Sequence, residues 1–117
     1  QEIAEKCTMN IIGLSSLQQS TMQRVGVLSE EDRRELLSKG AIGDIMGVFI
    51  DKDGNEIEWS RCKCYTGISL DCISKAKYVI CLAGEEEKAQ MLHLAIQFGY
   101  VNIPIISEKL AEALLRQ

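Results

Sequence analysis

Several features that mark particular protein classes are missing from this sequence. Its 13 basic residues are outnumbered by 17 acidic ones, which gives a net charge of −4. The chain therefore lacks the excess of basic residues that binding to duplex DNA requires. No apolar run approaches the roughly 18 residues of a membrane-spanning helix. The first residues lack the basic-then-apolar order of a secretory signal. We therefore expect a cytoplasmic protein with no membrane partner and no direct DNA contact through this segment.

The five cysteines lack the spacing of a metal site. Cys62 and Cys64 are separated by one residue, whereas zinc sites usually carry C-x2-C pairs with a second pair at a fixed distance. The single histidine, His93, is not placed near them by the sequence. Cys81 falls in an apolar strand and is most simply a small buried hydrophobe. We predict reduced thiols and no metal ion.

What is present is an ordinary globular composition with alternating structural periods. Hydrophobic residues make up 46% of the chain and charged residues 26%, in 117 positions without repeats or linkers. This length indicates one domain, residues 1–117. The predicted order is strand 9–13, a weak helix 17–25, helix 29–40, strand 45–50 with a turn at 51–55 and a return at 56–59, helix 69–75, strand 78–82, helix 85–98, strand 101–106 and a last helix capped by Ser107.

This alternation predicts an α/β fold: a Rossmann-like, three-layer α/β/α arrangement with a mostly parallel sheet, helices on both faces and an added β-hairpin. In such sheets ligands collect at the carboxyl ends of the strands. Gly13, Gly84 and Ile106 mark three of those ends.

Two motifs carry candidate chemistry near these ends. The segment 40–47 holds Asp44 between glycines, and the segment 79–88 ends a strand at Gly84 and opens a helix with Lys88 in its first turn. A carboxylate accepts strong hydrogen bonds from hydroxyls, and an ammonium near free amides at a helix start suits an anion. Together they suit a small phosphorylated polyol.

Motifs along nearly the whole chain resemble those of one family. They are Gly13, 28–32, 40–47, 53–54, 67–70, 83–84 with 87–88, and 99–102. The chain resembles the C-terminal half of the effector-binding domain of SorC-type sugar-responsive transcriptional regulators. The resemblance implies a fold similar to sugar-phosphate isomerases and glucosamine-6-phosphate deaminases, without catalysis and without a cofactor. It also implies an N-terminal helix-turn-helix domain that is absent from this chain.

The resemblance also implies a set of ligand-binding residues. Asp44 would contact ligand hydroxyls, Lys88 the phosphate or an adjacent oxygen, and Gly13 and Ser15 would line the pocket. Gly84 and Glu87 belong to the same glycine–Glu–Lys motif as Lys88. The complete predicted ligand-binding set is Gly13, Ser15, Asp44, Gly84, Glu87 and Lys88, with no catalytic residue.

Each of these residues also has a structural interpretation. Asp44 could accept backbone amides in a tight turn, and Lys88 could pair with Glu85, which stands where the family usually has a glycine. Ser15 could cap a helix, and Glu87 could be a surface charge near a helix start. Arg61 and Tyr65 could close over a ligand or serve a subunit contact.

The sequence thus favours a ligand-sensing domain of a bacterial regulator that binds a phosphorylated sugar and controls operator binding through the missing domain. A homo-oligomer is expected, because an unpaired sheet edge favours association. Two alternatives stay open: a fragment of a sugar-phosphate isomerase or deaminase-like enzyme, and an assembly module with a degenerate pocket.

Overall fold

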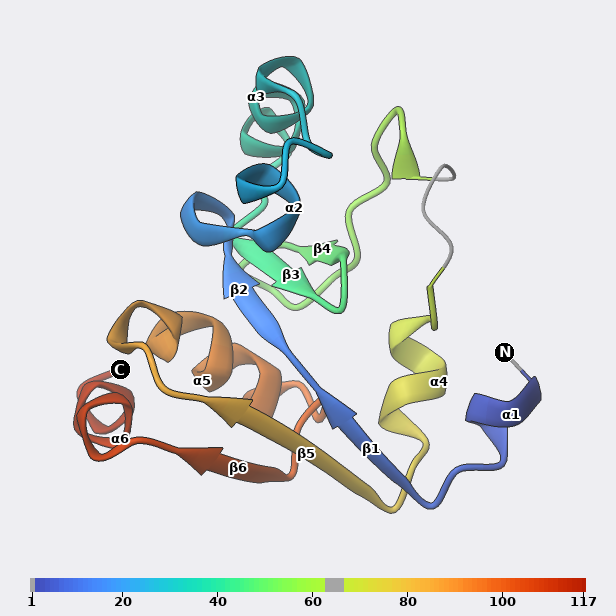
Figure 1. Cartoon of the computed structure of the whole chain (residues 1–117), viewed down its shortest axis with the longest axis vertical. Coiled ribbons are helices and arrows are strands. Elements are labelled where there is room, and N and C mark those ends of the chain that lie inside the picture. The colour runs from blue at the N-terminus through green and yellow to red at the C-terminus, as the bar shows by residue number, and fades with distance from the viewer. Residues whose placement is uncertain (1, 63–66) are drawn as a thin grey trace.

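The computed structural model describes residues 2–62 and 67–117. Figure 1 shows two small sheets joined by a continuous extended segment, with helices beside each. The elements are α1 (Glu2–Glu5), β1 (Met9–Ile12), β2 (Leu14–Ser16), η1 (Leu17–Gln19), α2 (Thr21–Arg24), α3 (Glu30–Ser38), β3 (Gly43–Ile45), β4 (Val48–Ile50), α4 (Leu70–Ser74), β5 (Tyr78–Ala83), η3 (Glu86–Lys88), α5 (Ala89–Gln97), β6 (Ile103–Ile106) and α6 (Glu108–Leu115).

The first sheet is parallel, with strand order β1-β5-β6. Its inner face carries Ile12, Val79 and Cys81, which are buried in one core with residues of α4, α5 and α6 such as Ile73 and Leu92. This core includes the alternating apolar positions of the strands and the inner stripe of α5. The predicted α/β class, with a parallel sheet and an added hairpin, is confirmed.

The opposite face of this sheet corrects one expectation. Ile11, Leu82 and Ile105 are 62%, 53% and 54% exposed, and Met9 and Tyr78 are exposed beside them. The two-sided helical cover that we expected is therefore not supplied by the residues that the structure describes. The apolar run of each strand predicts burial on both faces, but every helix in the core cluster packs on one of them.

The second sheet begins just after the end of β1, which is an edge strand of the first sheet. After Gly13 the chain of β1 continues as β2, which pairs antiparallel with β3, and β3 pairs with β4. The expected single strand 45–50 is wrong. Met46 and Gly47 have φ of 53° and 85° and form a tight turn between β3 and β4, as turns of this kind require. The apolar residues on both sides of this turn concealed it in the sequence.

The expected turn at 51–55 is present, but its return is short. Ile50 and Glu56 form an isolated antiparallel bridge, and the Ile57 amide donates to the Phe49 carbonyl at 2.8 Å. Residues 56–59 thus lie beside β4 without forming a named strand. The turn is held by Asp51, whose Oδ1 accepts the amides of Asp53 and Asn55.

A second core supports this antiparallel sheet. Phe49 and Trp59 meet edge to face with ring centroids 5.8 Å apart, and Leu36 of α3 is buried against the same cluster. A capping box starts α3: Ser29 Oγ accepts the Asp32 amide, and the Asp32 carboxylate accepts the Ser29 amide in return. Trp59 is therefore a packing residue of this second core.

The remaining predicted helices are found close to their expected positions. Ser69 and Ser107 cap α4 and α6 by accepting the amides of Cys72 and Leu110, and Gly40 follows α3 with a φ of 81°. No described helix is long and apolar enough to span a bilayer.

Candidate functional site

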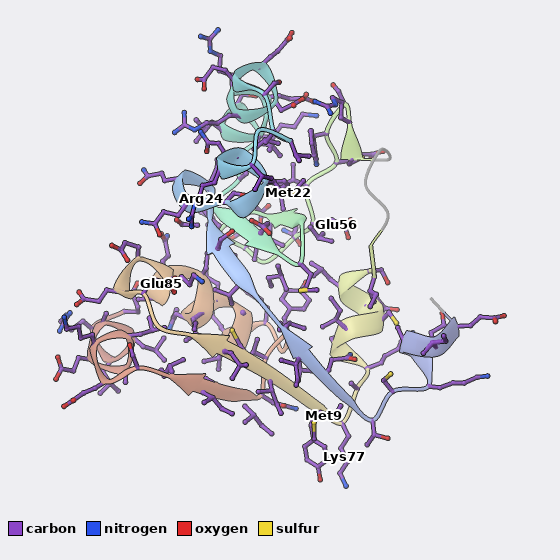
Figure 2. All side chains as sticks on the ribbon, in the orientation of Figure 1. Met9, Met22, Arg24, Glu56, Lys77 and Glu85 are labelled. Atoms are coloured by element: carbon purple, nitrogen blue, oxygen red, sulfur yellow. The ribbon has the colours of Figure 1, made fainter. Side chains whose placement is uncertain are left out.

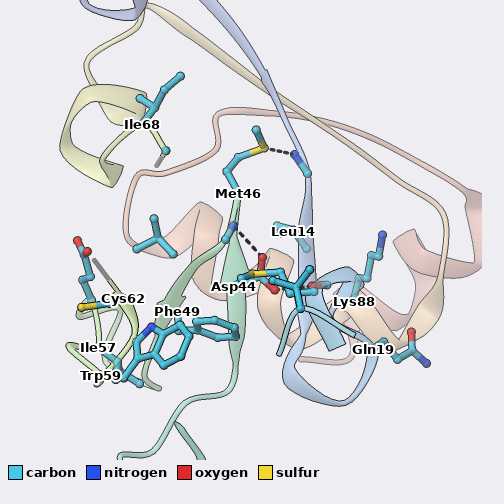
Figure 3. A pocket seen from close by; sticks show the side chains of 18 of the residues that line it. Leu14, Gln19, Asp44, Met46, Phe49, Ile57, Trp59, Cys62, Ile68 and Lys88 are labelled. Carbon is cyan, nitrogen blue, oxygen red and sulfur yellow. Dashed lines mark hydrogen bonds between the residues drawn. The ribbon is translucent and has the colours of Figure 1, made fainter. Parts of the chain in front are cut away.

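A pocket of about 730 Å³ lies where β1 passes into β2, between the antiparallel sheet and the start of η3 (Figure 3). Pockets of this size suit small organic ligands. Its described lining residues come from segments far apart in the sequence. They are Gly13, Leu14, Ser15, Gln19, Met22, Arg24, Val27, Asp44, Met46, Gly47, Val48, Phe49, Glu56, Ile57, Trp59, Cys62, Gly67, Ile68, Ser69, Glu85 and Lys88.

Asp44 lies in this pocket on β3, directly across from Ser15 on β2. Its Oδ1 accepts the Ser15 hydroxyl at 2.6 Å, and its Oδ2 accepts the Gly47 amide at 2.9 Å. Each carboxylate oxygen has a second lone pair, so these bonds orient the group without using up its capacity to accept. Asp44 thus accepts a backbone amide in the tight turn, as the structural interpretation predicts. It also lies in the pocket wall.

Lys88 lines the same pocket at the end of η3 (Figure 3). Its Nζ lies 3.1 Å from Oε2 of Glu85, and the lysine side chain is 19% exposed while that of Glu85 is 58% exposed. Glu85 Oε2 also accepts the Gly84 amide at 3.3 Å. The cation that would meet a phosphate therefore already has an internal carboxylate partner.

The electrostatics of this end of the pocket follow from these contacts. Glu85's own backbone amide, Lys88 and the Gly84 amide hold the pKa of the Glu85 carboxyl below its ordinary value. Burial raises the pKa of the Cys81 thiol, and the nearby positive charge of Lys88 partly opposes that rise. Glu85 is thus ionised, and Cys81 is a protonated core residue at neutral pH.

The structure brings four of the six predicted ligand-binding residues together. Gly13, Ser15, Asp44 and Lys88 line the pocket, whereas Gly84 and Glu87 are adjacent in sequence to lining residues but are not among the described ones that line it. Glu87 is exposed, which agrees with its interpretation as a surface charge. Contact of any of the six with a ligand stays a prediction.

Sequence reasoning missed several charged or polar lining residues. Arg24 at the end of α2, Glu56 at the isolated bridge and Glu85 before η3 reach the pocket from different parts of the fold (Figure 2). Gln19 contributes an amide from η1. Gln19, Arg24 and Glu56 lie in short or irregular segments with no motif, so only their positions in space reveal them. Glu85 stands in the motif of Lys88, where the sequence indicated a partner for that lysine and not a lining residue.

Other residues that the sequence singled out have different surroundings. Arg61 donates to Asp32 at 2.6 Å and so braces the cap of α3. Cys62 lines the pocket, while Cys64 and Tyr65 fall outside the described residues. Among residues 2–62 and 67–117, no cluster of three or more histidine, cysteine, aspartate or glutamate side chains is placed to hold a metal ion.

Comparison with known proteins identifies the family of this arrangement. Residues 1–116 match the family described as "Putative sugar-binding domain". The transcriptional regulator LsrR of Klebsiella pneumoniae subsp. pneumoniae is 31% identical over 109 residues, which cover 90% of this chain and 34% of that protein. The deoxyribonucleoside regulator of Bacillus subtilis is 33% identical over 92 residues, covering 79% and 29%.

Solved structures agree with these sequence matches. A DeoR family transcriptional regulator from Listeria monocytogenes superimposes with a TM-score of 0.88 at 30% identity, covering 97% of this chain and 46% of that one. The full-length sorbitol operon regulator SorC from Klebsiella pneumoniae has a TM-score of 0.81 at 24% identity, covering 97% and 37%, and shows the shared fold. The chain spans about a third of the length of these curated relatives.

Proposed function

The chain belongs to the sugar-binding domain family, and on that premise we propose that it is the ligand-sensing part of a bacterial DNA-binding transcriptional regulator. The observation that carries the proposal is that Asp44, an oriented carboxylate, and Lys88, a largely buried lysine, both line one pocket; Figure 3 shows both among its lining side chains. The names of the similar proteins, which are transcriptional regulators, support the regulatory role. The chain acts within a longer protein whose helix-turn-helix domain would read the operator in the cytoplasm.

We propose a phosphorylated sugar as the ligand. Asp44, Ser15 and Gln19 supply hydrogen-bonding groups for hydroxyls, and Lys88 and Arg24 supply two cations for an anionic group. Phe49 and Trp59 give the pocket an apolar side against which the carbon atoms of a sugar can pack. Hydroxyl acceptors, cations and an apolar wall are the three features that a sugar phosphate requires together.

Binding rather than catalysis fits the described lining residues. Sugar isomerisation needs a carboxylate base, usually with a second acid or a histidine facing it. The Asp44 carboxylate accepts from Ser15 and Gly47, and of the two other acids in the described lining, Glu85 is paired with Lys88 and Glu56 lies at the isolated bridge. His93 is exposed on α5 and is not among the described residues of the pocket. We propose that the domain senses its ligand without converting it.

The sensing step would couple the pocket to association and operator binding. A ligand shifts an equilibrium between two states only by its difference in affinity for them. The pocket is lined by the antiparallel sheet and by Glu85 and Lys88, which follow strand β5 of the parallel sheet. The two sheets are connected at Gly13, so a ligand that contacts both groups of lining residues can favour one relative arrangement of the sheets. The exposed apolar face of β1-β5-β6 supports the expected homo-oligomer, because such faces mark contact surfaces.

The test is a ligand panel of sugar phosphates and the matching free sugars. Calorimetry and thermal unfolding report binding, and product analysis of the same mixtures reports turnover. Saturable binding and a higher melting temperature without product support the sensor. Product formation would instead support the enzyme, and neither binding nor turnover across the panel would support the assembly module.

A further inference from the structure

We propose that Glu85 sets the charge preference of the pocket, because its carboxylate competes with the anionic group of a ligand for Lys88. This inference rests on the proposed function and deepens it: a dianionic phosphate ester has to displace Glu85, whereas a neutral sugar does not. Glu85 would then be a specificity-determining residue that tunes affinity downward for anions.

The contacts of Glu85 support this competition. One oxygen, Oε2, lies 3.1 Å from Lys88 Nζ and 3.3 Å from the amide nitrogen of Gly84. A phosphate oxygen approaching Lys88 would need the same hydrogen-bond donors that this carboxylate oxygen accepts from. Glu85 and Lys88 both line the pocket, so Glu85 and a ligand phosphate would compete for Lys88 inside the proposed ligand site.

The two partners differ in how firmly they are held. The Lys88 side chain is 19% exposed, whereas the Glu85 side chain is 58% exposed. Glu85 can therefore turn outward into solvent at little desolvation cost, while Lys88 stays in the pocket wall. An ion pair with one well-exposed partner is weak, so displacement of Glu85 by a ligand is feasible and lowers the apparent affinity without abolishing binding.

The charge balance of the pocket further disfavours the binding of an anionic ligand. Its described charged lining residues are the acids Asp44, Glu56 and Glu85 and the cations Arg24 and Lys88, a formal balance of −1. A dianion entering this pocket meets like charge, which disfavours it. Removing the charge of Glu85 frees Lys88 and brings the formal balance to zero.

Inorganic phosphate is the direct probe, because it carries the anionic group without any sugar. We would titrate the wild type, Glu85→Gln and the control Glu86→Gln with phosphate, and in parallel with glucose and glucose 6-phosphate, by calorimetry at constant ionic strength. Glu86 is exposed, lies one residue away and is not among the described pocket residues, so its variant makes the same change in net charge outside the site. Thermal unfolding of each variant verifies that it is folded.

We expect Glu85→Gln to bind phosphate about threefold to fivefold more tightly than the wild type, because a weak ion pair no longer has to be broken, while Glu86→Gln matches the wild type. Any binding of glucose should be the same in all three proteins. Equal gains in both variants, unchanged or weaker phosphate binding by Glu85→Gln, or no phosphate binding by it would overturn the proposal. The failure of the proposed function is distinct, since it requires that neither glucose 6-phosphate nor any other member of the sugar panel binds.

Discussion

Ser15 and Asp44 face each other across antiparallel strands, and the Ser15 hydroxyl donates a 2.6 Å hydrogen bond to Asp44 Oδ1 in a buried position. This bond joins β2, which continues the chain of β1, to β3 of the hairpin that carries the acid. It therefore orients the candidate ligand acceptor within the antiparallel sheet. The same pair has a structural role and a proposed ligand-binding role, and substitution can separate the two.

Asp44→Ala should lower both stability and ligand selectivity. It leaves the buried Ser15 hydroxyl and the Gly47 amide without their acceptor, which costs about 1–3 kcal/mol in the free energy of unfolding, measurable by urea denaturation. In calorimetry, we expect discrimination among sugars with different hydroxyl patterns to fall more than affinity for the phosphate group. An equal loss of affinity for every ligand would contradict the hydroxyl-binding role. Ser15→Ala is the matched control, because it removes the inter-strand bond and keeps the carboxylate.

Lys88→Ala should weaken the binding of sugar phosphates by about tenfold or more, because a charge-assisted hydrogen bond is lost. Lys109→Ala is the control, since Lys109 is exposed on α6 and is not among the described residues of the pocket. Calorimetry with a sugar phosphate that binds the wild type measures both. An unchanged dissociation constant for the Lys88 variant would remove this lysine from the site.

The exposed face of the parallel sheet should control self-association. Leu82→Glu places a charge among Ile11, Ile105 and Tyr78, all exposed on the same face, and should shift the protein toward monomer in sedimentation velocity. Leu115→Glu is the control, because Leu115 is 86% exposed on α6, away from this face. If both variants sediment like the wild type, this face does not mediate the expected homo-oligomer.

Asp32 should make stability dependent on acid pH. Burial alone would raise the pKa of this carboxyl, but the Ser29 amide and hydroxyl and the Arg61 guanidinium outweigh it, so the pKa lies below its ordinary value of 3.8. The folded state therefore binds the proton less readily than the unfolded state. Its contribution is present above pH 3.8 and is lost as the pH falls through the lower folded value.

Urea denaturation between pH 6 and pH 2.5 measures this contribution. Asp32→Asn should cost about 1 kcal/mol at pH 6, in the range of a lost helix cap, and the gap to the wild type should narrow as the pH falls below 3.8. A gap that stays constant with pH would show that the charge of Asp32 contributes nothing. Glu31→Asn is a control in the same first turn of α3, since Glu31 is exposed.

The helices and parallel strands were predictable because their signals are local. Ser29, Ser69 and Ser107 precede apolar-periodic segments and each caps the expected helix. The turn at Met46 and Gly47 was not predictable in the same way, because it interrupts an unbroken apolar segment and requires a positive φ at a methionine. A local pattern of apolar residues does not distinguish one strand from two strands of a hairpin.

The candidate site was likewise predictable only in part from the sequence. Asp44 and Lys88 stand in motifs, and Gly13 marks a strand end, so the sequence alone pointed to them. Arg24 and Glu56 are in the pocket only because η1–α2 and the isolated bridge at Glu56 fold against it. No local pattern encodes that approach.

The sequence by itself determined the α/β class and the helix caps and pointed to Asp44 and Lys88 as candidate ligand-binding residues, since each depends on residue types at short spacing. Only the tertiary structure decided that Glu85 holds Lys88, that Ser15 orients Asp44 and that one sheet face stays uncovered by the described residues. These features depend on the direction in which the folded backbone points each side chain, and a local sequence pattern does not specify that direction.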